Sequence, residues 1–273
     1  MDRISILVNT CDSYSDVWPL FFRILEKTWP DCKKYKIYLN TEHKNYEDTF
    51  FDIEVLSVIS SKQNIGWGKR LIDCVNRIDS EIILFLLEDF FFEEPVDDER
   101  ITKIIDWMDK NKNIAALSLT SIYDVGEDDY SGKYGFVLRK KKVHYTLNAS
   151  PTLYRKETLL KYTDINDNPW EWEFFGSIRT WHSPKEFYAK ATNTHDIFKY
   201  DIKRGGAIHR GKWVGCTVSR LLKQYGFEAD LETRGVIDDW LKYNPEKPKR
   251  TIFTISKNKY LFIKNYIKSI VLR

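Results

Sequence analysis

The chain has 273 residues, of which 42% are hydrophobic and 30% charged, a length and composition that exclude an intrinsically disordered protein. Its formal net charge of +3 gives no argument for nucleic acid as a partner. The four cysteines form no C-x-x-C pair, which argues against a zinc knuckle or a redox motif. The sequence has neither a secretory signal nor an apolar segment of transmembrane length, so we expect a cytoplasmic protein, soluble or bound at a membrane surface.

The first half of the chain alternates strand and helix patterns. Short apolar runs or alternation predict strands, and apolar residues three and four apart predict helices. In chain order, the patterns predict strand 4–8, helix 17–28, strands 35–40 and 52–59, helix 71–78, strand 82–87, helix 101–108 and strand 114–119. This order predicts an α/β/α sandwich of Rossmann type with a largely parallel sheet. Ligands of such sheets bind beyond the carboxyl ends of the strands, so polar residues that end strands are candidate site residues.

The second half is less regular. It predicts strands 134–139, 143–147 and 188–192 and helices 156–162, 169–181 and 214–225, the last stopped by Gly226. The chain has no internal repeat and no low-complexity linker, so we expect one main domain, residues 1–235, and a C-terminal extension, residues 236–273.

An acidic pair follows the most apolar run of the chain, residues 82–87 (IILFLL). Glu88 and Asp89 stand where a buried central strand ends. Two carboxylates there can hold Mg²⁺ or Mn²⁺, hard cations that take oxygen ligands and bridge to phosphates. The alternative interpretation is that the pair only starts a loop.

Glycines precede the helix that begins after residue 66. Gly66 and Gly68 can let backbone N–H groups approach an anion, and Lys69 or Arg70 can then contact a diphosphate or ribose. The spacing is not that of a P-loop, and an ordinary loop-to-helix turn is the alternative.

A capping pattern begins the helix at 169–181. Asn168 at the N-cap, Pro169 at N1 and Glu171 at N3 predict a capping box, which gives Glu171 a structural role. Glu173 lies about 200° round the helix from Glu171.

Glu173 shares its helix face with Gly176, Ser177 and Thr180. We expect this face to be open, and a carboxylate on it suits a general base that deprotonates a sugar hydroxyl. The alternative is a solvated glutamate. Glu173 is therefore the candidate catalytic base, and Glu171 is the second candidate catalytic carboxylate.

A glycine-rich basic segment spans residues 205–213, and we expect it to be too kinked for regular structure. His209, Arg210 and Lys212 lie between glycines, and a flexible basic loop of this kind can close over a diphosphate. His209 is also a candidate metal ligand through a ring nitrogen.

The last segment, residues 257–273, predicts a basic amphipathic helix without acidic residues. Tyr260, Ile263, Ile267 and Ile270 recur at helical spacing among lysines. Such helices lie on anionic membrane surfaces; the alternative is a helix packed on the domain or on a second subunit.

Three of these features together resemble the GT-A glycosyltransferases, most closely the bacterial enzymes of capsule, lipopolysaccharide and other surface-glycan synthesis. They are the segment Asn9-Thr10-Cys11-Asp12 after the first strand, the helix start at residues 66–70 and the acidic pair at 88–89. The resemblance covers residues 1–225. It implies a GT-A-like fold and a nucleotide-sugar donor.

The resemblance also implies roles for residues at the donor end. Thr10 and Asp12 would contact the base or ribose of the nucleotide, with residues 40–42 nearby. Arg70 would hold the nucleotide, with Trp67 beside it in the nucleotide-sugar site.

The resemblance places Asp89, with Glu88 beside it, where the family's metal-binding D-x-D motif is expected. The sequence departs from that motif because the third position is Phe. His209, Arg210 and Lys212 resemble the late basic element that binds metal or diphosphate, and either His209 completes a metal shell or the two cations replace the metal.

The resemblance puts Glu173 at the position of the base in the inverting members. The sequence thus predicts transfer of a hexosyl group to a hydroxyl of a growing, lipid-linked or free glycan, with Mn²⁺ or Mg²⁺ and with inversion. Two alternatives remain. A sugar nucleotidyltransferase ranks low because the loop after the first strand lacks glycine and arginine. A non-catalytic glycan- or nucleotide-binding module would use a surface around Trp170 and Trp172.

Overall fold

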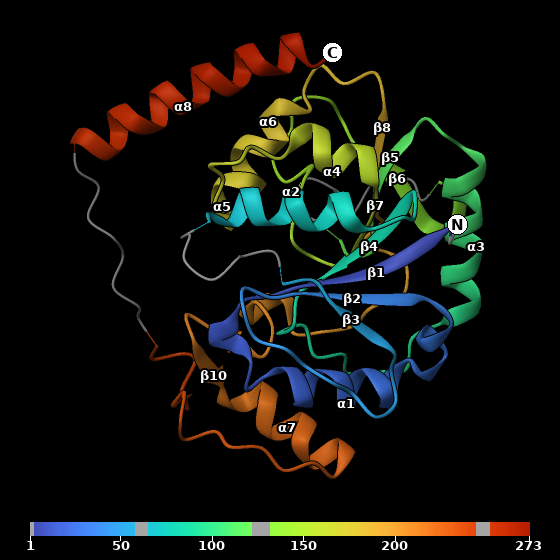
Figure 1. Ribbon diagram of the computed structural model, residues 1–273, viewed down its shortest axis with the longest axis vertical. Coiled ribbons are helices and arrows are strands. Elements are labelled where there is room, and N and C mark those ends of the chain that lie inside the picture. The colour runs from blue at the N-terminus through green and yellow to red at the C-terminus, as the bar shows by residue number, and fades with distance from the viewer. Residues whose placement is uncertain (1–2, 58–64, 122–131, 244–251) are drawn as a thin grey trace.

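The computed structural model describes residues 3–57, 65–121, 132–243 and 252–273, and Figure 1 shows its arrangement. In this part of the chain an eight-stranded sheet has the order β3-β2-β1-β4-β7-β5-β8-β6. β7 is antiparallel to both its neighbours and β6 is antiparallel to β8, and the other pairings are parallel. The strands are β1 (Ile4–Asn9), β2 (Lys36–Asn40), β3 (Ile53–Val55), β4 (Ile82–Leu86), β5 (Ile114–Ser118), β6 (Phe136–Leu138), β7 (Thr152–Arg155) and β8 (Glu186–Lys190).

Helices cover both faces of the sheet. α1, α3 and α7 pack on one face, where Phe21, Ile104 and Leu221 belong to one apolar core. α2 and α4 pack on the other face with Leu71 and Leu159 in a second core. The helices are α1 (Trp18–Thr28), α2 (Trp67–Arg77), α3 (Asp98–Lys110), α4 (Lys156–Tyr162), α5 (Pro169–Glu171), α6 (Ser177–Arg179), α7 (Gly215–Tyr225) and α8 (Ile252–Val271). The predicted fold class, an α/β sandwich with a mostly parallel sheet and a C-terminal helix, is confirmed.

Shorter elements complete the described chain. A π-helical segment joins α5 to α6, so these three form one continuous helix. A second, three-stranded sheet has the order β11-β10-β9. The bounds are η4 (Trp172–Gly176) for the π segment, η1 (Asp12–Tyr14), η2 (Pro30–Lys34), η3 (Lys133–Gly135) and η5 (Ile202–Arg204) for 3-10 turns, and β9 (Ile208–His209), β10 (Lys212–Val214) and β11 (Val236–Ile237) for the small sheet.

The structure corrects two predicted elements. The strand predicted at 143–147 is wrong, because Lys142 and Tyr145 have φ values of 62° and 56° that interrupt an extended chain. The segment 205–213, expected to be irregular, contains the hairpin of β9 and β10. β7 was not predicted, and β3 is shorter than the predicted strand 52–59, whose last two residues lie outside the described residues.

Three further features concern the domain plan. Gly226 ends α7 in the left-handed region, as predicted. β11 pairs with β10, so strand pairing runs across the boundary predicted at residue 235. Among the described helices, none combines the length and the apolar character that crossing a bilayer requires.

Candidate functional site

The candidate site lies at the carboxyl edge of the parallel strands. β1 pairs with β2 on one side and with β4 on the other, so the chain changes direction across the sheet between β1 and β4. Ligands of open α/β sheets bind at such a switch point. Thr10 follows β1 there, and Glu88 and Asp89 follow β4.

The acidic pair is partly withdrawn from water: Glu88 is buried and Asp89 is half-buried. Glu88 is 6% exposed, and burial raises its pKa to about 7, although Thr10, Arg234 and Arg70 lower it. Burial and the neighbouring charge of Glu88 raise the pKa of Asp89 well above its ordinary value. A positive charge brought to the pair would favour its ionised state.

Asp89 has an oxygen suited to such a charge. Its Oδ1 is buried and has no hydrogen-bond partner among the described residues. A carboxylate acceptor in this state fits a hard cation such as Mg²⁺ or Mn²⁺. The described part of the chain contains no group of three or more His, Cys, Asp or Glu side chains that could hold a metal ion. Further ligands would therefore have to come from substrate or water.

Asp12 joins the loop after β1 to the loop after β2. Its carboxylate accepts hydrogen bonds from the backbone N–H groups of Glu42 (3.0 Å), His43 (3.0 Å) and Lys44 (3.2 Å), and its own N–H donates to Glu42 Oε2 at 3.0 Å. Burial opposes ionisation, but these donors bring the pKa of Asp12 below its ordinary value. The carboxylate thus holds the two loops together, and its contact with a nucleotide stays a prediction.

Thr10 has a comparable structural contact. Its Oγ1 accepts a hydrogen bond from Trp18 Nε1 at 2.8 Å in a buried setting.

Arg70 brings a buried guanidinium to this edge. The residue is 4% exposed, and its Nη1 makes no hydrogen bond within the described part of the chain. Its Nη1 makes a long ion pair with Glu42 Oε1, at 4.0 Å. A buried guanidinium with spare donors suits recognition of a phosphate or ribose.

The glycines before Arg70 have structural contacts, whereas the sequence suggested that their backbone N–H groups approach an anion. Gly66 is the N-cap of α2, but the N–H of Gly68 donates to Asp167 O at 2.9 Å and is not available to an anion. A Cβ on Gly68 would lie 2.1 Å from Asp164 O, so close packing requires glycine there. Trp67 packs its ring 5.5 Å from the ring of Trp172.

Arg234 and Tyr14 belong to the site and were missed from sequence. The Arg234 guanidinium lies 4.5 Å from the centre of the Tyr14 ring, and its Nε donates to Asp16 at 2.6 Å. Burial and then the charges of Asp89 and Glu88 raise the pKa of Tyr14 to about 12. Arg234 follows no recognisable pattern, so only tertiary structure brings it to these residues.

The β9–β10 hairpin carries the predicted basic residues. Arg210 and Gly211 form its turn with φ values of 50° and 81°, and Arg210 and Lys212 are exposed there. Arg234 Nη1 donates to Gly211 O at 3.4 Å and links the turn to the loop after β1. The His209 ring lies edge-on to Trp240 and Tyr243, at 5.1 and 5.7 Å between centroids.

The start of the hairpin touches the acidic turn directly. The N–H of Ala207 donates to the backbone O of Asp89 at 2.8 Å. A Cβ on Gly206 would lie 2.6 Å from the same oxygen, and the φ of Gly206 is +101°. Glycine is therefore required where this segment crosses Asp89.

The capping box that places the second carboxylate is confirmed. Asn168 Oδ1 accepts the N–H of Glu171 at 2.9 Å, and the Glu171 carboxylate accepts the N–H of Asn168 and also pairs with Lys257 at 3.4 Å. Glu171 thus has structural contacts, and its catalytic role stays a prediction.

Glu173 lies in the π segment, half-buried. Its Oε1 accepts the N–H of Ala149 at 2.8 Å, and burial raises its pKa despite this bond. The open face expected around it is wrong, because Gly176, Ser177 and Thr180 are all buried. Ser177 is fixed by accepting the N–H of Leu147 at 3.0 Å, so this face packs against protein.

Tyr200 connects the two groups of carboxylates. It is 7% exposed, its ring lies 4.5 Å from that of Phe90, and its hydroxyl is 3.3 Å from Ser150 Oγ. Burial raises its pKa first, and the charges of Asp89 and Glu173 raise it further. Both carboxylates therefore lie within Coulombic range of one phenol. Tyr200 stands in a segment without strand or helix pattern, and no sequence signal identified it.

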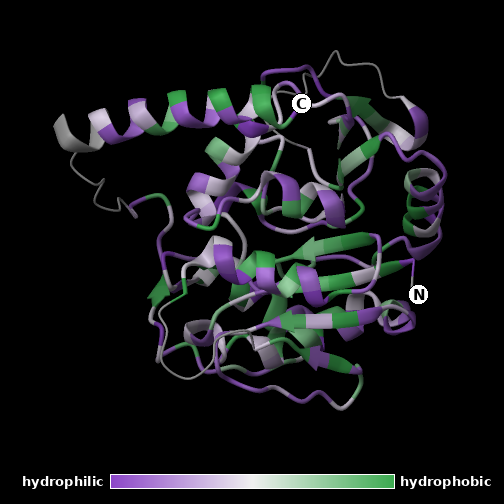
Figure 2. Cartoon of the chain, turned by 45° about the horizontal axis from the view of Figure 1, so that its top comes forward, coloured by the Kyte–Doolittle hydropathy of each residue, from purple (hydrophilic) through white to green (hydrophobic). Residues whose placement is uncertain are grey.

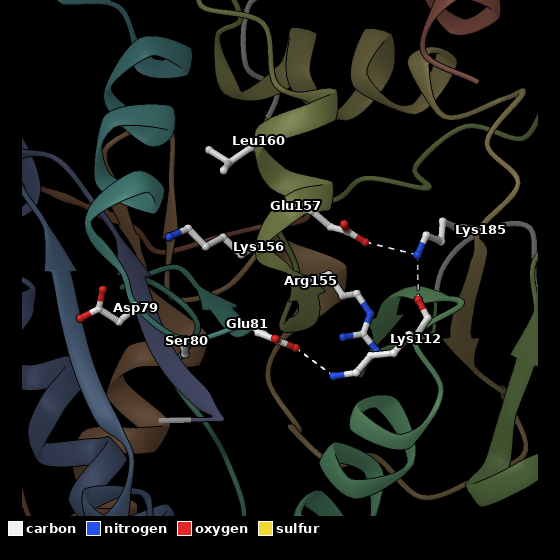
Figure 3. Close-up of a pocket in the computed structure, with 9 residues that line it drawn as sticks. All are labelled: Asp79, Ser80, Glu81, Lys112, Arg155, Lys156, Glu157, Leu160 and Lys185. Atoms are coloured by element: carbon white, nitrogen blue, oxygen red, sulfur yellow. Dashed lines mark hydrogen bonds and ion pairs between the residues drawn. The ribbon is translucent and has the colours of Figure 1, made fainter. Parts of the chain in front are cut away.

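A cavity of about 530 Å³ lies elsewhere, near the start of β4 and the end of β7 (Figure 3). Its cations already have hydrogen-bond or ion-pair partners in the described chain. Lys112 pairs with Glu81 at 2.9 Å and Lys185 with Glu157 at 3.3 Å, while Arg155 Nε donates to a backbone carbonyl at 2.8 Å. The cavity is thus larger than a water site, but none of its described lining side chains has a buried polar atom without a hydrogen bond, as Asp89 and Arg70 have at the carboxyl edge.

Comparison with known proteins gives likenesses of fold only. No protein-family model and no curated protein matches the chain. The chain is similar to S. aureus TarS 1-349 in complex with UDP-GlcNAc (14% identity, TM-score 0.44, 85% of this chain and 68% of that one). It is similar to the mannosyltransferase PcManGT from Pyrobaculum calidifontis in complex with GDP-Man and Mn²⁺ (8%, 0.47, 99% and 73%) and to the galactosyltransferase LgtC in complex with donor and acceptor sugar analogs (14%, 0.38, 59% and 60%). Against another crystal structure of S. aureus TarS 1-349, the chain spans 60% of that protein's length.

Proposed function

We propose that the chain is a glycosyltransferase that moves a sugar from a nucleoside-diphosphate sugar to a hydroxyl of a surface-glycan acceptor, at the cytoplasmic face of the cell. One observation carries the proposal. An acidic pair at the sheet switch point, with Glu88 buried and Asp89 half-buried, and a second, half-buried carboxylate, Glu173, lie around one phenol, because the charges of Asp89 and Glu173 both raise the pKa of Tyr200. A metal ion held by the acidic pair would supply the counter-charge that phosphate binding needs, and Glu173 would supply the base that hydroxyl activation needs.

The donor end of the site supports binding of a diphosphate. Asp89 and Glu88 would hold Mn²⁺ or Mg²⁺, whose charge would offset that of the departing diphosphate. Arg70 contributes a buried guanidinium, and Arg210 and Lys212 contribute exposed cations on the hairpin turn. The residues present thus suit a leaving group with several negative charges.

The acceptor end supports proton removal. Glu173 Oε1 is held by Ala149, and none of the described residues donates a hydrogen bond to Oε2. The proton of the acceptor hydroxyl passes to this carboxylate. The acceptor oxygen forms its bond to the anomeric carbon as the bond to the diphosphate oxygen breaks, and the diphosphate leaves with that electron pair. A single displacement of this kind inverts the anomeric carbon.

The alternative of a glycan-binding surface around two tryptophans loses one of its rings. Trp170 is 77% exposed, but Trp172 is fully buried and donates from Nε1 to Thr163 at 2.9 Å. We also propose that residues 1–235 carry transfer and that residues 236–273 are an extension.

Thermal unfolding with nucleotides tests the donor site. A nucleoside diphosphate at about a hundred times its Kd stabilises the folded state by about 2.7 kcal/mol. We expect the Tm to rise with one nucleotide, to rise further with Mn²⁺, and to lose the Mn²⁺ effect in Asp89→Asn. Asp79→Asn, an exposed acid beside the cavity of Figure 3, is the matched control. A Tm that no nucleotide changes would overturn the proposal.

A further inference from the structure

Helix α8 turns its polar side toward the domain. Asn265 and Ser269 are 4% and 1% exposed. Arg179 Nη1 donates to Asn265 Oδ1 at 2.7 Å, and Ser269 Oγ lies 2.8 Å from His182 Nδ1. Arg179 is itself buried, donates to Tyr162 O at 2.7 Å, and so fixes the rotation of the helix against α6. Beside these polar contacts, the rings of Phe262 and Tyr266 lie 6.0 and 6.4 Å from that of Trp181.

The apolar side of α8 faces away from the protein. At 100° per residue, five large apolar side chains lie within an arc of about 100° opposite Asn265 and Ser269. We call this set the outer stripe. Its members and exposed fractions are Tyr260 (64%), Ile263 (58%), Ile267 (55%), Ile270 (52%) and Val271 (79%). Figure 1 shows α8 extending away from the rest of the molecule, and Figure 2 shows hydrophobic and hydrophilic residues alternating along it.

Positive charge flanks the outer stripe on both sides. Lys264 lies along one edge of the stripe and Lys259 along the other, and neither has an ion pair in the described structure. Lys257 and Lys268 pair with acids of the domain. The sequence of α8 contains no Asp or Glu. The exposed side of the helix is therefore apolar at its centre and basic at its edges.

This combination selects among partners. A second copy of α8 docked on the outer stripe would bring lysines against lysines without an acid between them. A bilayer with anionic lipids accepts the apolar side chains below its headgroups and the lysines among its phosphates. The helix does not cross the bilayer, since polar side chains recur in every turn. We propose that α8 docks the protein flat on an anionic membrane surface through the outer stripe.

Vesicle flotation of the full chain tests this docking without reference to sugar transfer. The probes are vesicles of phosphatidylcholine alone and vesicles in which phosphatidylglycerol replaces one third of it. We expect flotation only with the anionic vesicles, and a loss of about tenfold or more in the double variant Ile263→Asp, Ile267→Asp. Leu138→Asp is the matched control, because Leu138 is 52% exposed but lies on β6. The far-ultraviolet circular dichroism of both variants must equal that of the wild type.

Lys259→Glu combined with Lys264→Glu tests the electrostatic part. This variant should lose the preference for anionic vesicles, and added salt should weaken wild-type flotation in the same direction. Equal flotation with both vesicle types, or flotation unchanged in the Ile263 and Ile267 double variant, overturns the proposal. So does a dimer in solution that this double variant converts to monomer while flotation is retained. Turnover measured on a water-soluble acceptor should be unchanged in the double variant, which separates a failed docking proposal from a failed transferase proposal.

Discussion

The two ends of the central sheet differ in how their charged side chains find partners. Around the cavity of Figure 3, Lys112 and Lys185 have carboxylate partners, and Arg155 donates to backbone carbonyls. At the carboxyl edge, Asp89 Oδ1 and Arg70 Nη1 are buried without hydrogen-bond partners in the described chain. Unsatisfied buried polar groups destabilise a fold, so they persist where a ligand satisfies them. The difference indicates that buried polar atoms without a hydrogen bond, rather than cavity volume, mark the candidate site.

The largest expected effect is on kcat, and it should differ between a variant at the candidate site and a variant beside the cavity. Glu173→Gln should lower kcat by about a hundredfold or more, because a general base is lost while donor binding remains. Glu157→Gln, beside the cavity, should leave kcat unchanged. Steady-state kinetics with nucleotide titration measures both. Equal activities of the two variants would remove Glu173 from the mechanism.

The second prediction concerns the segment that crosses Asp89. Gly206→Ala should reduce the free energy of unfolding by about 1–3 kcal/mol, because its Cβ would lie 2.6 Å from Asp89 O at a φ of +101°. Gly205→Ala is the control: its φ is +78°, and no described atom lies within 4 Å of the added Cβ, so it should cost about 1 kcal/mol from backbone strain alone. Urea unfolding distinguishes the two, and equal losses would contradict a tight contact at Asp89.

The third prediction is a pH dependence set by Glu173. Burial raises the pKa of this carboxyl above that of an exposed glutamate. The base must be ionised, so kcat/KM should fall about tenfold per pH unit below the raised pKa. Stability should change in the opposite sense: the contribution of Glu173 is present below its unfolded pKa and is lost as pH rises through its folded pKa. Parallel pH profiles of turnover and of urea unfolding measure both, and a flat acid limb of turnover would argue against this base.

The smallest effect is expected at the paired end. Lys112→Met removes ion pairs whose side chains are more than half exposed on the lysine side, so unfolding should change by less than about 1 kcal/mol. Donor affinity and kcat should equal those of the wild type. A loss of donor binding in Lys112→Met would reverse the assignment of the two ends.

The elements that could be predicted are those whose pattern is local. The apolar run before Glu88 gives β4, and the Asn168 capping box gives α5, because strand burial and helix capping depend on neighbouring residues. β7 was missed because it is only four residues long and follows Pro151. The expected open face beside Glu173 failed because packing by Leu147, a distant segment, covers it.

The candidate site could be predicted in part for the same reason. Parallel strands end at one edge, so Thr10 and Asp89 could be placed together from their positions after strands. Tyr200 and Arg234 could not, since each reaches the site from a segment without periodic pattern. Their place in the candidate site depends on contacts between residues far apart in the sequence, which composition and spacing do not reveal.

The contact between Arg234 and Asp16 joins residues that are 218 positions apart. Because a chain is synthesised from its N-terminus, the loop after β1 leaves the ribosome long before its guanidinium partner. The nascent sheet therefore presents Glu88 and Asp89 without one of the two arginines that lower the pKa of Glu88. The candidate site is therefore complete only after residue 234 has been synthesised, and a ribosome stalled before that residue holds a chain whose candidate site lacks Arg234.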